Sequence, residues 1–179
     1  MKNEILKRVL SSIVLFILTF YCIIKGSYFF IILIILIFLI SSFEWFKMSK
    51  NKSYFLLGIL YLIFSLFCVF QLRFNFTSDA MLFLLITNIC ILTDIGGYIF
   101  GKIFKGPRLT KISPNKTYAG MIGSYILSLT SVLTISNFID YYAPTIIIIF
   151  LIIMISTISQ LGDIIISYFK RLAHIKNSG

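Results

Sequence analysis

Two acidic residues fall inside long apolar stretches, where acids are rare. The chain has only 6 Asp and Glu among 179 residues, and Asp94 and Asp163 lie within or at the end of such stretches. An ionised carboxylate at the centre of a membrane helix costs about 2.5–3.5 kcal/mol unless it is paired or faces a wet cavity. Both acids are therefore candidates for chemistry. The competing interpretation is a buried carboxylate that caps a packing interface.

Asp163 belongs to a set of polar residues spaced three or four apart, which places them along one face of a helix. The set is Ser156, Gln160, Asp163, Ser167, Lys170 and His174. Such a face cannot contact lipid, so it lines a hydrophilic cavity or packs on other polar groups. A divalent cation could bind the carboxylate while Lys170 and Arg171 bind phosphate oxygens. The alternative is an amphipathic helix whose two basic side chains only reach lipid headgroups.

A basic segment, residues 102–118, provides a second candidate for anion binding. Ser113 suits the N-cap of a following helix and Pro114 its first position. Lys116 and Thr117 would then lie in the first turn, where free backbone N–H groups favour anions. The competing interpretation is a basic loop that only fixes membrane topology.

The glycines after Asp94 could suggest nucleotide binding, but the pattern is incomplete. Gly96 to Lys102 fits G-x-x-x-x-G-K, yet Ile103 occupies the Ser/Thr position and an apolar helix precedes it instead of a strand. This excludes a P-loop. Gly97 and Gly101 instead predict close contact with another helix, with Asp94 directed into the bundle.

The elements that position these residues are long apolar segments. The chain is 59% hydrophobic and 12% charged, whereas soluble domains carry about 25% charged residues. We predict an all-α, polytopic membrane helical bundle of about six transmembrane helices, forming a single integral membrane domain over residues 1–179. The expected spans are 9–24, 28–46, 54–72, 81–100, 119–135 and 145–166.

The basic residues predict the orientation of these spans. With a cytoplasmic N-terminus, fourteen of the 16 Lys and Arg residues lie on the inner side, as the positive-inside rule requires. We therefore expect both termini and any active face to be cytoplasmic, in a multi-pass protein of the inner (plasma) membrane. The net charge of +10 is spread over short loops, which favours anionic membrane lipid as the partner and argues against nucleic acid.

The motifs in the second half resemble the phosphatidate cytidylyltransferase (CDP-diacylglycerol synthase) family. The resemblance covers 92–179, whereas 1–91 agrees only as generic spanning helices. The family pattern has an Asp-x-Gly-Ala/Gly-Tyr helix, an Ile-Ser-Pro-Lys-Lys-Thr loop ending in Glu-Gly, and a Ser-x-x-Lys-Arg signature. The corresponding segments here are Asp94 to Tyr98, Ile112 to Gly120, Gln160 to Asp163, and Ser167 to Arg171.

The resemblance implies an enzyme that joins CTP and phosphatidate into CDP-diacylglycerol and diphosphate, using Mg²⁺. It assigns the metal to Asp163 and makes Asp94 a second acid in the cavity. Phosphate contacts fall to Lys116 and the catalytic pair Lys170 and Arg171. Substrate or water would be oriented by Ser113, Thr117, Gln160 and Ser167. Homodimerisation is left open.

Several departures from the family pattern affect this expectation. Asn115, Ala119 and Asn177 replace the usual Lys, Glu and Asp, and the sequence stops at Gly179, where family members continue through Pro-Gly-His-Gly-Gly to a second metal-binding acid. The 179-residue chain is therefore expected to be C-terminally truncated and inactive, or nearly so, by itself. Two rival interpretations are a CTP-dependent kinase of polyprenol or another long-chain alcohol, and a non-catalytic membrane fragment of an interrupted gene.

Overall fold

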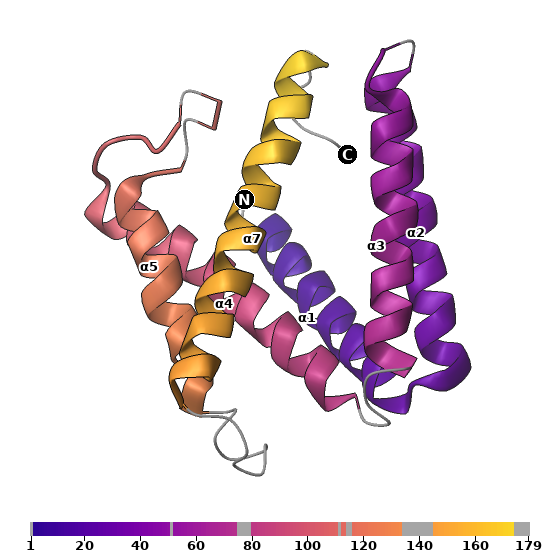
Figure 1. Ribbon diagram of the computed structural model, residues 1–179, viewed down its shortest axis with the longest axis horizontal. Coiled ribbons are helices and arrows are strands. Elements are labelled where there is room, and N and C mark those ends of the chain that lie inside the picture. The colour runs from indigo at the N-terminus through magenta and orange to yellow at the C-terminus, as the bar shows by residue number, and fades with distance from the viewer. Residues whose placement is uncertain are drawn as a thin grey trace. The chain divides into compact units, whose positions relative to one another are not determined.

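A computed structural model describes residues 2–50, 52–74, 80–110, 112–113, 116–133 and 145–173. Within these ranges the regular secondary structure is helical, apart from one isolated antiparallel bridge between Arg108 and Thr117. The predicted all-α class is confirmed. The labelled helices are α1 (Lys2–Lys25), α2 (Ser27–Ser49), α3 (Phe55–Phe74), α4 (Met81–Phe104), α5 (Tyr118–Leu129) and α7 (Thr145–Leu172) (Figure 1).

The helices form two compact units, residues 1–82 and 83–179. In the first unit α2 and α3 pack side by side (Figure 1). The ring of Trp45 on α2 lies against Gly58 on α3, where any side chain would collide with it. Trp45 Nε1 also donates a hydrogen bond to the carbonyl oxygen of Phe55 over 3.0 Å. A glycine in α3 therefore accommodates the largest side chain of α2.

A buried arginine holds the other end of the first unit together. Arg73, on α3, lies with its guanidinium 5.8 Å from the Phe30 ring centroid and 5.7 Å from that of Phe74. Its Nη2 donates to the carbonyl oxygen of Ile23 over 3.4 Å, one of the carbonyls left unpaired at the end of α1. Gly26, with φ of 63°, lacks the Cβ that would meet this nitrogen. The positive charge of Arg73 thus stabilises the negative end of the α1 dipole.

The second unit contains α4, α5 and α7, and glycines join the first two. A Cβ placed on Gly120 of α5 would lie 2.8 Å from the carbonyl oxygen of Gly97 on α4. A Cβ on Gly101 would lie 3.3 Å from Thr117 Oγ1, and one on Gly96 would collide with the backbone of Gly123. The predicted close contact through Gly97 and Gly101 is confirmed.

Four helices of the described chain, α2, α3, α4 and α7, are long and apolar enough to cross a membrane. The described apolar stretches Ile13–Lys25 and Tyr118–Leu133 are shorter. The helix expected over 119–135 is interrupted by a turn at Thr130, whose N–H bonds to the carbonyl oxygens of Leu127 and Ser128. The count of six spans and the sides of the termini stay predictions.

Candidate active site

The second unit contains a partly open cavity of about 210 Å³ between α4, α5, α7 and the segment before α5. It brings together residues that are far apart in the sequence. The predicted site residues in its lining are Asp94, Lys116, Thr117, Gln160 and Asp163. The cavity therefore lies where four separate segments meet, and each segment contributes a polar side chain to its lining.

Both carboxylates lie well inside their helices. Asp94 is ten residues before the end of α4 and Asp163 nine residues before the end of α7. At 1.5 Å per residue, each acid lies about 14–15 Å from the C-terminal end of its helix. This depth agrees with the expectation that the two acids face a cavity within the bundle.

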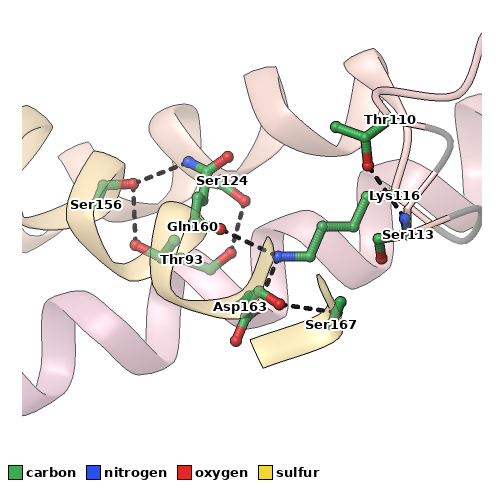
Figure 2. A network of polar contacts seen from close by, with 9 residues as sticks. All are labelled: Thr93, Thr110, Ser113, Lys116, Ser124, Ser156, Gln160, Asp163 and Ser167. Carbon is green, nitrogen blue, oxygen red and sulfur yellow. Dashed lines mark hydrogen bonds and ion pairs between the residues drawn. The ribbon is translucent and has the colours of Figure 1, made fainter. Parts of the chain in front are cut away.

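Lys116 and Asp163 form an ion pair in the cavity (Figure 2). Lys116 Nζ lies 2.8 Å from Asp163 Oδ2, and the side chains are 27% and 56% exposed. The same nitrogen donates to the backbone carbonyl oxygen of Gln160 over 3.4 Å. Partly exposed pairs of this kind contribute only about 0.2–1 kcal/mol. A ligand that offers phosphate to the lysine or a cation to the carboxylate can therefore replace the pair at little cost.

The backbone between α4 and α5 positions Lys116. The Leu109 N–H donates to the Lys116 carbonyl oxygen over 2.7 Å, and the Tyr118 N–H donates to that of Pro107 over 3.1 Å. These antiparallel contacts keep the chain extended up to Thr117, which has φ of −119° and ψ of 157°. Lys116 therefore projects from a paired backbone segment.

The predicted N-cap at Ser113 is wrong. The helix begins at Tyr118, and its N-cap is Thr117, whose hydroxyl accepts the Gly120 N–H over 3.1 Å. Lys116 and Thr117 hence precede the first turn instead of lying in it. Ser113 forms a turn, with its N–H donating to Thr110 Oγ1 over 3.1 Å. Ser and Thr cap helices with the same chemistry, so only the backbone pairing selects Thr117 over Ser113 as the N-cap. Pro114 lies outside the described residues.

Buried hydroxyl groups behind the cavity link all three helices. Thr93 of α4 and Ser156 of α7 are 1% and 0% exposed, and Thr93 Oγ1 bonds to Ser156 Oγ over 3.1 Å. Ser124 of α5 donates to the Thr93 carbonyl oxygen over 2.8 Å. Gln160 Nε2 donates to Ser156 Oγ over 3.4 Å (Figure 2). The sequence singled out Ser156 and Gln160 by their spacing.

Thr93 and Ser124 were missed as functional residues. Thr93 precedes Asp94 in an apolar helix, and Ser124 follows Gly123 in a hydroxyl-rich one. Small hydroxyl residues are common where membrane helices pack. The sequence around Thr93 or Ser124 therefore does not distinguish a residue that lines a cavity from one that only packs against another helix.

The remaining predicted site residues lie outside the cavity lining. Ser167 Oγ donates to the backbone oxygen of Asp163 over 2.7 Å, and Arg171 Nε donates to that of Ile112 over 3.4 Å. Neither these two residues nor Ser113 and Lys170 line the cavity. Their assigned roles stay predictions, and His174 lies outside the described residues.

The oxygen donors of the cavity suit a hard cation. Mg²⁺ in proteins is commonly bound by one or two carboxylates together with waters and substrate phosphates. Asp94 and Asp163 supply two carboxylates to one cavity. No group of three or more His, Cys, Asp or Glu that could hold a metal occurs in the described part of the chain. The donor set thus fits a magnesium ion whose coordination is completed by water and substrate.

Comparison with known proteins decides the family. The sequence profile described as "Cytidylyltransferase family" matches residues 52–179. The chain belongs to the cytidylyltransferase family. It is therefore an enzyme of the nucleotidyltransferase class, and the matched region includes all residues of the cavity.

Individual relatives agree with this assignment. A phosphatidate cytidylyltransferase of Rickettsia felis is 33% identical over 189 residues, covering 99% of this chain and 82% of the relative. The protein of the same name from Rickettsia conorii is 35% identical, with 99% and 80% covered. That of Staphylococcus saprophyticus is 33% identical over 140 residues, with 74% and 52% covered. No solved structure matches this cytidylyltransferase.

Proposed function

We propose that this cytidylyltransferase joins CTP to phosphatidate, giving CDP-diacylglycerol and diphosphate. The observation that carries the proposal is the cavity in which Lys116 meets Asp163, with Asp94 in the same lining, inside a unit built from apolar helices. The relatives named phosphatidate cytidylyltransferase support the choice of substrates because two of them align with 99% of the chain.

The reaction needs charge neutralisation more than acid–base chemistry. A phosphatidate oxygen forms a bond to the α-phosphorus of CTP, and the bond to the bridging oxygen breaks, so that diphosphate leaves with the electron pair. Negative charge grows on the leaving group, and fixed positive charge stabilises that change. Lys116 is positioned for this role because its ammonium group already lies in the cavity. It would bind a phosphate oxygen after leaving Asp163.

The carboxylates are the groups that would hold Mg²⁺, with Asp163 as the main ligand and Asp94 as the second. When bound, the ion would neutralise phosphate charge and orient the triphosphate. Asp163 would exchange its ion pair with Lys116 for the metal, which leaves the lysine free for phosphate.

The surroundings of the cavity suit a water-soluble substrate, CTP, and a lipid substrate, phosphatidate, from the bilayer. The helices of the second unit expose large apolar side chains, among them Ile95, Ile122 and Ile158, as a lipid-embedded surface requires. The basic segment before α5 favours a cytoplasmic opening at the inner (plasma) membrane, where CTP is available. Homodimerisation stays a prediction.

Position-labelled CTP tests the proposal against its rivals. Purified full-length enzyme in phosphatidate-containing vesicles with Mg²⁺ should transfer label from the α-phosphorus of CTP to lipid and release γ-label as diphosphate. A kinase would transfer γ-label to a long-chain alcohol and leave α-label in CDP. Transfer of γ-label to lipid, or no transfer by correctly inserted protein, would contradict the proposal.

A further inference from the structure

The buried hydroxyls of Thr93 and Ser156 have no assigned role, although they are connected to a cavity residue. We propose that they are positioning residues, which fix the Gln160 amide so that its carbonyl oxygen accepts a hydrogen bond from the nucleotide. The inference rests on the proposed function, because it names a determinant of nucleotide binding in the same site. Thr93 and Ser156 act only through Gln160.

The hydrogen bonds give the amide a direction. Ser156 Oγ is hydrogen-bonded to Thr93 Oγ1 over 3.1 Å and accepts from Gln160 Nε2 over 3.4 Å. Figure 2 shows the amide nitrogen of Gln160 turned toward Ser156 and the carbonyl oxygen turned away from it. The side-chain carbonyl oxygen of Gln160 accepts no hydrogen bond from the described residues, and Gln160 lines the cavity. The free acceptor is thus available to a ligand.

The anchor of this amide is rigid. Thr93 Oγ1 also donates to the Ile89 carbonyl oxygen over 2.8 Å, and Ser124 holds the Thr93 carbonyl oxygen over 2.8 Å. Gly97 lets Ser124 approach, since a Cβ there would lie 2.9 Å from its hydroxyl oxygen. Three helices therefore fix the position of Ser156 Oγ. A glutamine bonded to a fixed point loses less freedom when it binds a ligand.

A nucleotide group that binds this oxygen must be a hydrogen-bond donor. Phosphate oxygens in their ionised form only accept, so they cannot bind this oxygen directly. The donors of CTP are the 4-amino group of cytosine and the ribose hydroxyls. UTP carries an acceptor in place of the amino group, and 2′-deoxy-CTP lacks one hydroxyl. Comparison of these nucleotides therefore distinguishes the two sources.

The test measures CTP binding by equilibrium dialysis and the KM for CTP on the full chain in vesicles. Thr93→Val and Ser156→Ala should each raise Kd and KM about three- to tenfold, the range for one lost hydrogen bond, while kcat changes less. Thr93→Ser should restore normal values. Ser128→Ala is the matched control, because Ser128 is 0% exposed and donates within its own helix, to the Tyr125 carbonyl oxygen over 3.1 Å.

A double-mutant cycle shows whether the hydroxyls act through the glutamine. In Gln160→Met, the further change Ser156→Ala should have no additional effect on Kd. Additive effects, an unchanged Kd in both hydroxyl variants, or an equal rise in Ser128→Ala would overturn the proposal. Because binding is measured apart from turnover, CTP binding without CDP-diacylglycerol formation would contradict the proposed function alone. If the hydroxyl variants show a reduced preference for CTP over UTP, the donor to Gln160 is the 4-amino group. If they show a reduced preference for CTP over 2′-deoxy-CTP, the donor is the 2′-hydroxyl.

Discussion

Replacing Asp163 with asparagine separates a catalytic role from a structural one. Asp163→Asn keeps the size of the side chain and its ability to accept a hydrogen bond from Lys116, but it removes the negative charge. In the structure this charge has one cationic partner among the described residues, at 2.8 Å. The two possible roles of the charge predict effects of very different size.

The structural effect should be small. Asp163 is 56% exposed, so its ion pair contributes at most about 1 kcal/mol after solvent screening. For a chain of this size such a loss lowers Tm by about 2–4 °C. If the same carboxylate holds the metal against the triphosphate, its loss should remove about 4 kcal/mol of transition-state stabilisation, or about a thousandfold in rate.

The assay compares initial rates of CDP-diacylglycerol formation and thermal unfolding for the same vesicle preparations of the full-length enzyme. Glu44→Gln is the control, because it removes another carboxylate, on α2 in the first unit, and should leave both quantities almost unchanged. A rate within about threefold of wild type for Asp163→Asn would refute the metal assignment. A fall in Tm much greater than predicted would show instead that the ion pair is mainly structural.

Three other predictions follow from packing and charge. Gly96→Ala should lower stability by about 1–3 kcal/mol through overpacking, whereas Gly162→Ala, where a Cβ meets nothing within 4 Å, should not; equal Tm values for the two would contradict the glycine contact between α4 and α5. Gly26→Ala should cost more than Gly106→Ala in thermal unfolding, because both have positive φ but only the first adds a collision with the buried arginine; the reverse order would contradict the role of that arginine. A reporter fused at Leu109 should indicate cytoplasm, and an outside signal would contradict the topology.

The sequence predicts the helices well because each depends on local hydropathy. Apart from Tyr54, which lies one residue before α3, all residues of the five stronger apolar segments fall within helices of the structure. The weaker segment, residues 119–135, contains a turn at Thr130. Its glycines and hydroxyl residues permit a turn but do not predict where it occurs. Spacing along α7 also placed Gln160 and Asp163 on the cavity side, because helical periodicity is a local property.

The site was less predictable from the sequence than the helices, because it depends on tertiary contacts. The pairing that places Lys116 against Asp163 depends on two backbone hydrogen bonds, from the Tyr118 N–H to the Pro107 carbonyl oxygen and from the Leu109 N–H to the Lys116 carbonyl oxygen. No residue type in that segment specifies them. Ser113 and Thr117 are equivalent caps in sequence, and only this pairing selects Thr117. Likewise, Thr93 lines the cavity but, among the described residues, is linked to α7 only through its hydrogen bond to Ser156, which is 63 residues away in the chain.

Photochemical cross-linking of a CTP analogue tests most directly whether the cavity of the second unit is the nucleotide site. The full chain in vesicles is irradiated with a base-azido CTP and Mg²⁺, digested, and mapped by mass spectrometry. The account predicts label on peptides containing residues 109–121 or 156–163, and its loss when excess CTP is added. Label displaced by CTP but confined to α1, α2 or α3 would contradict it.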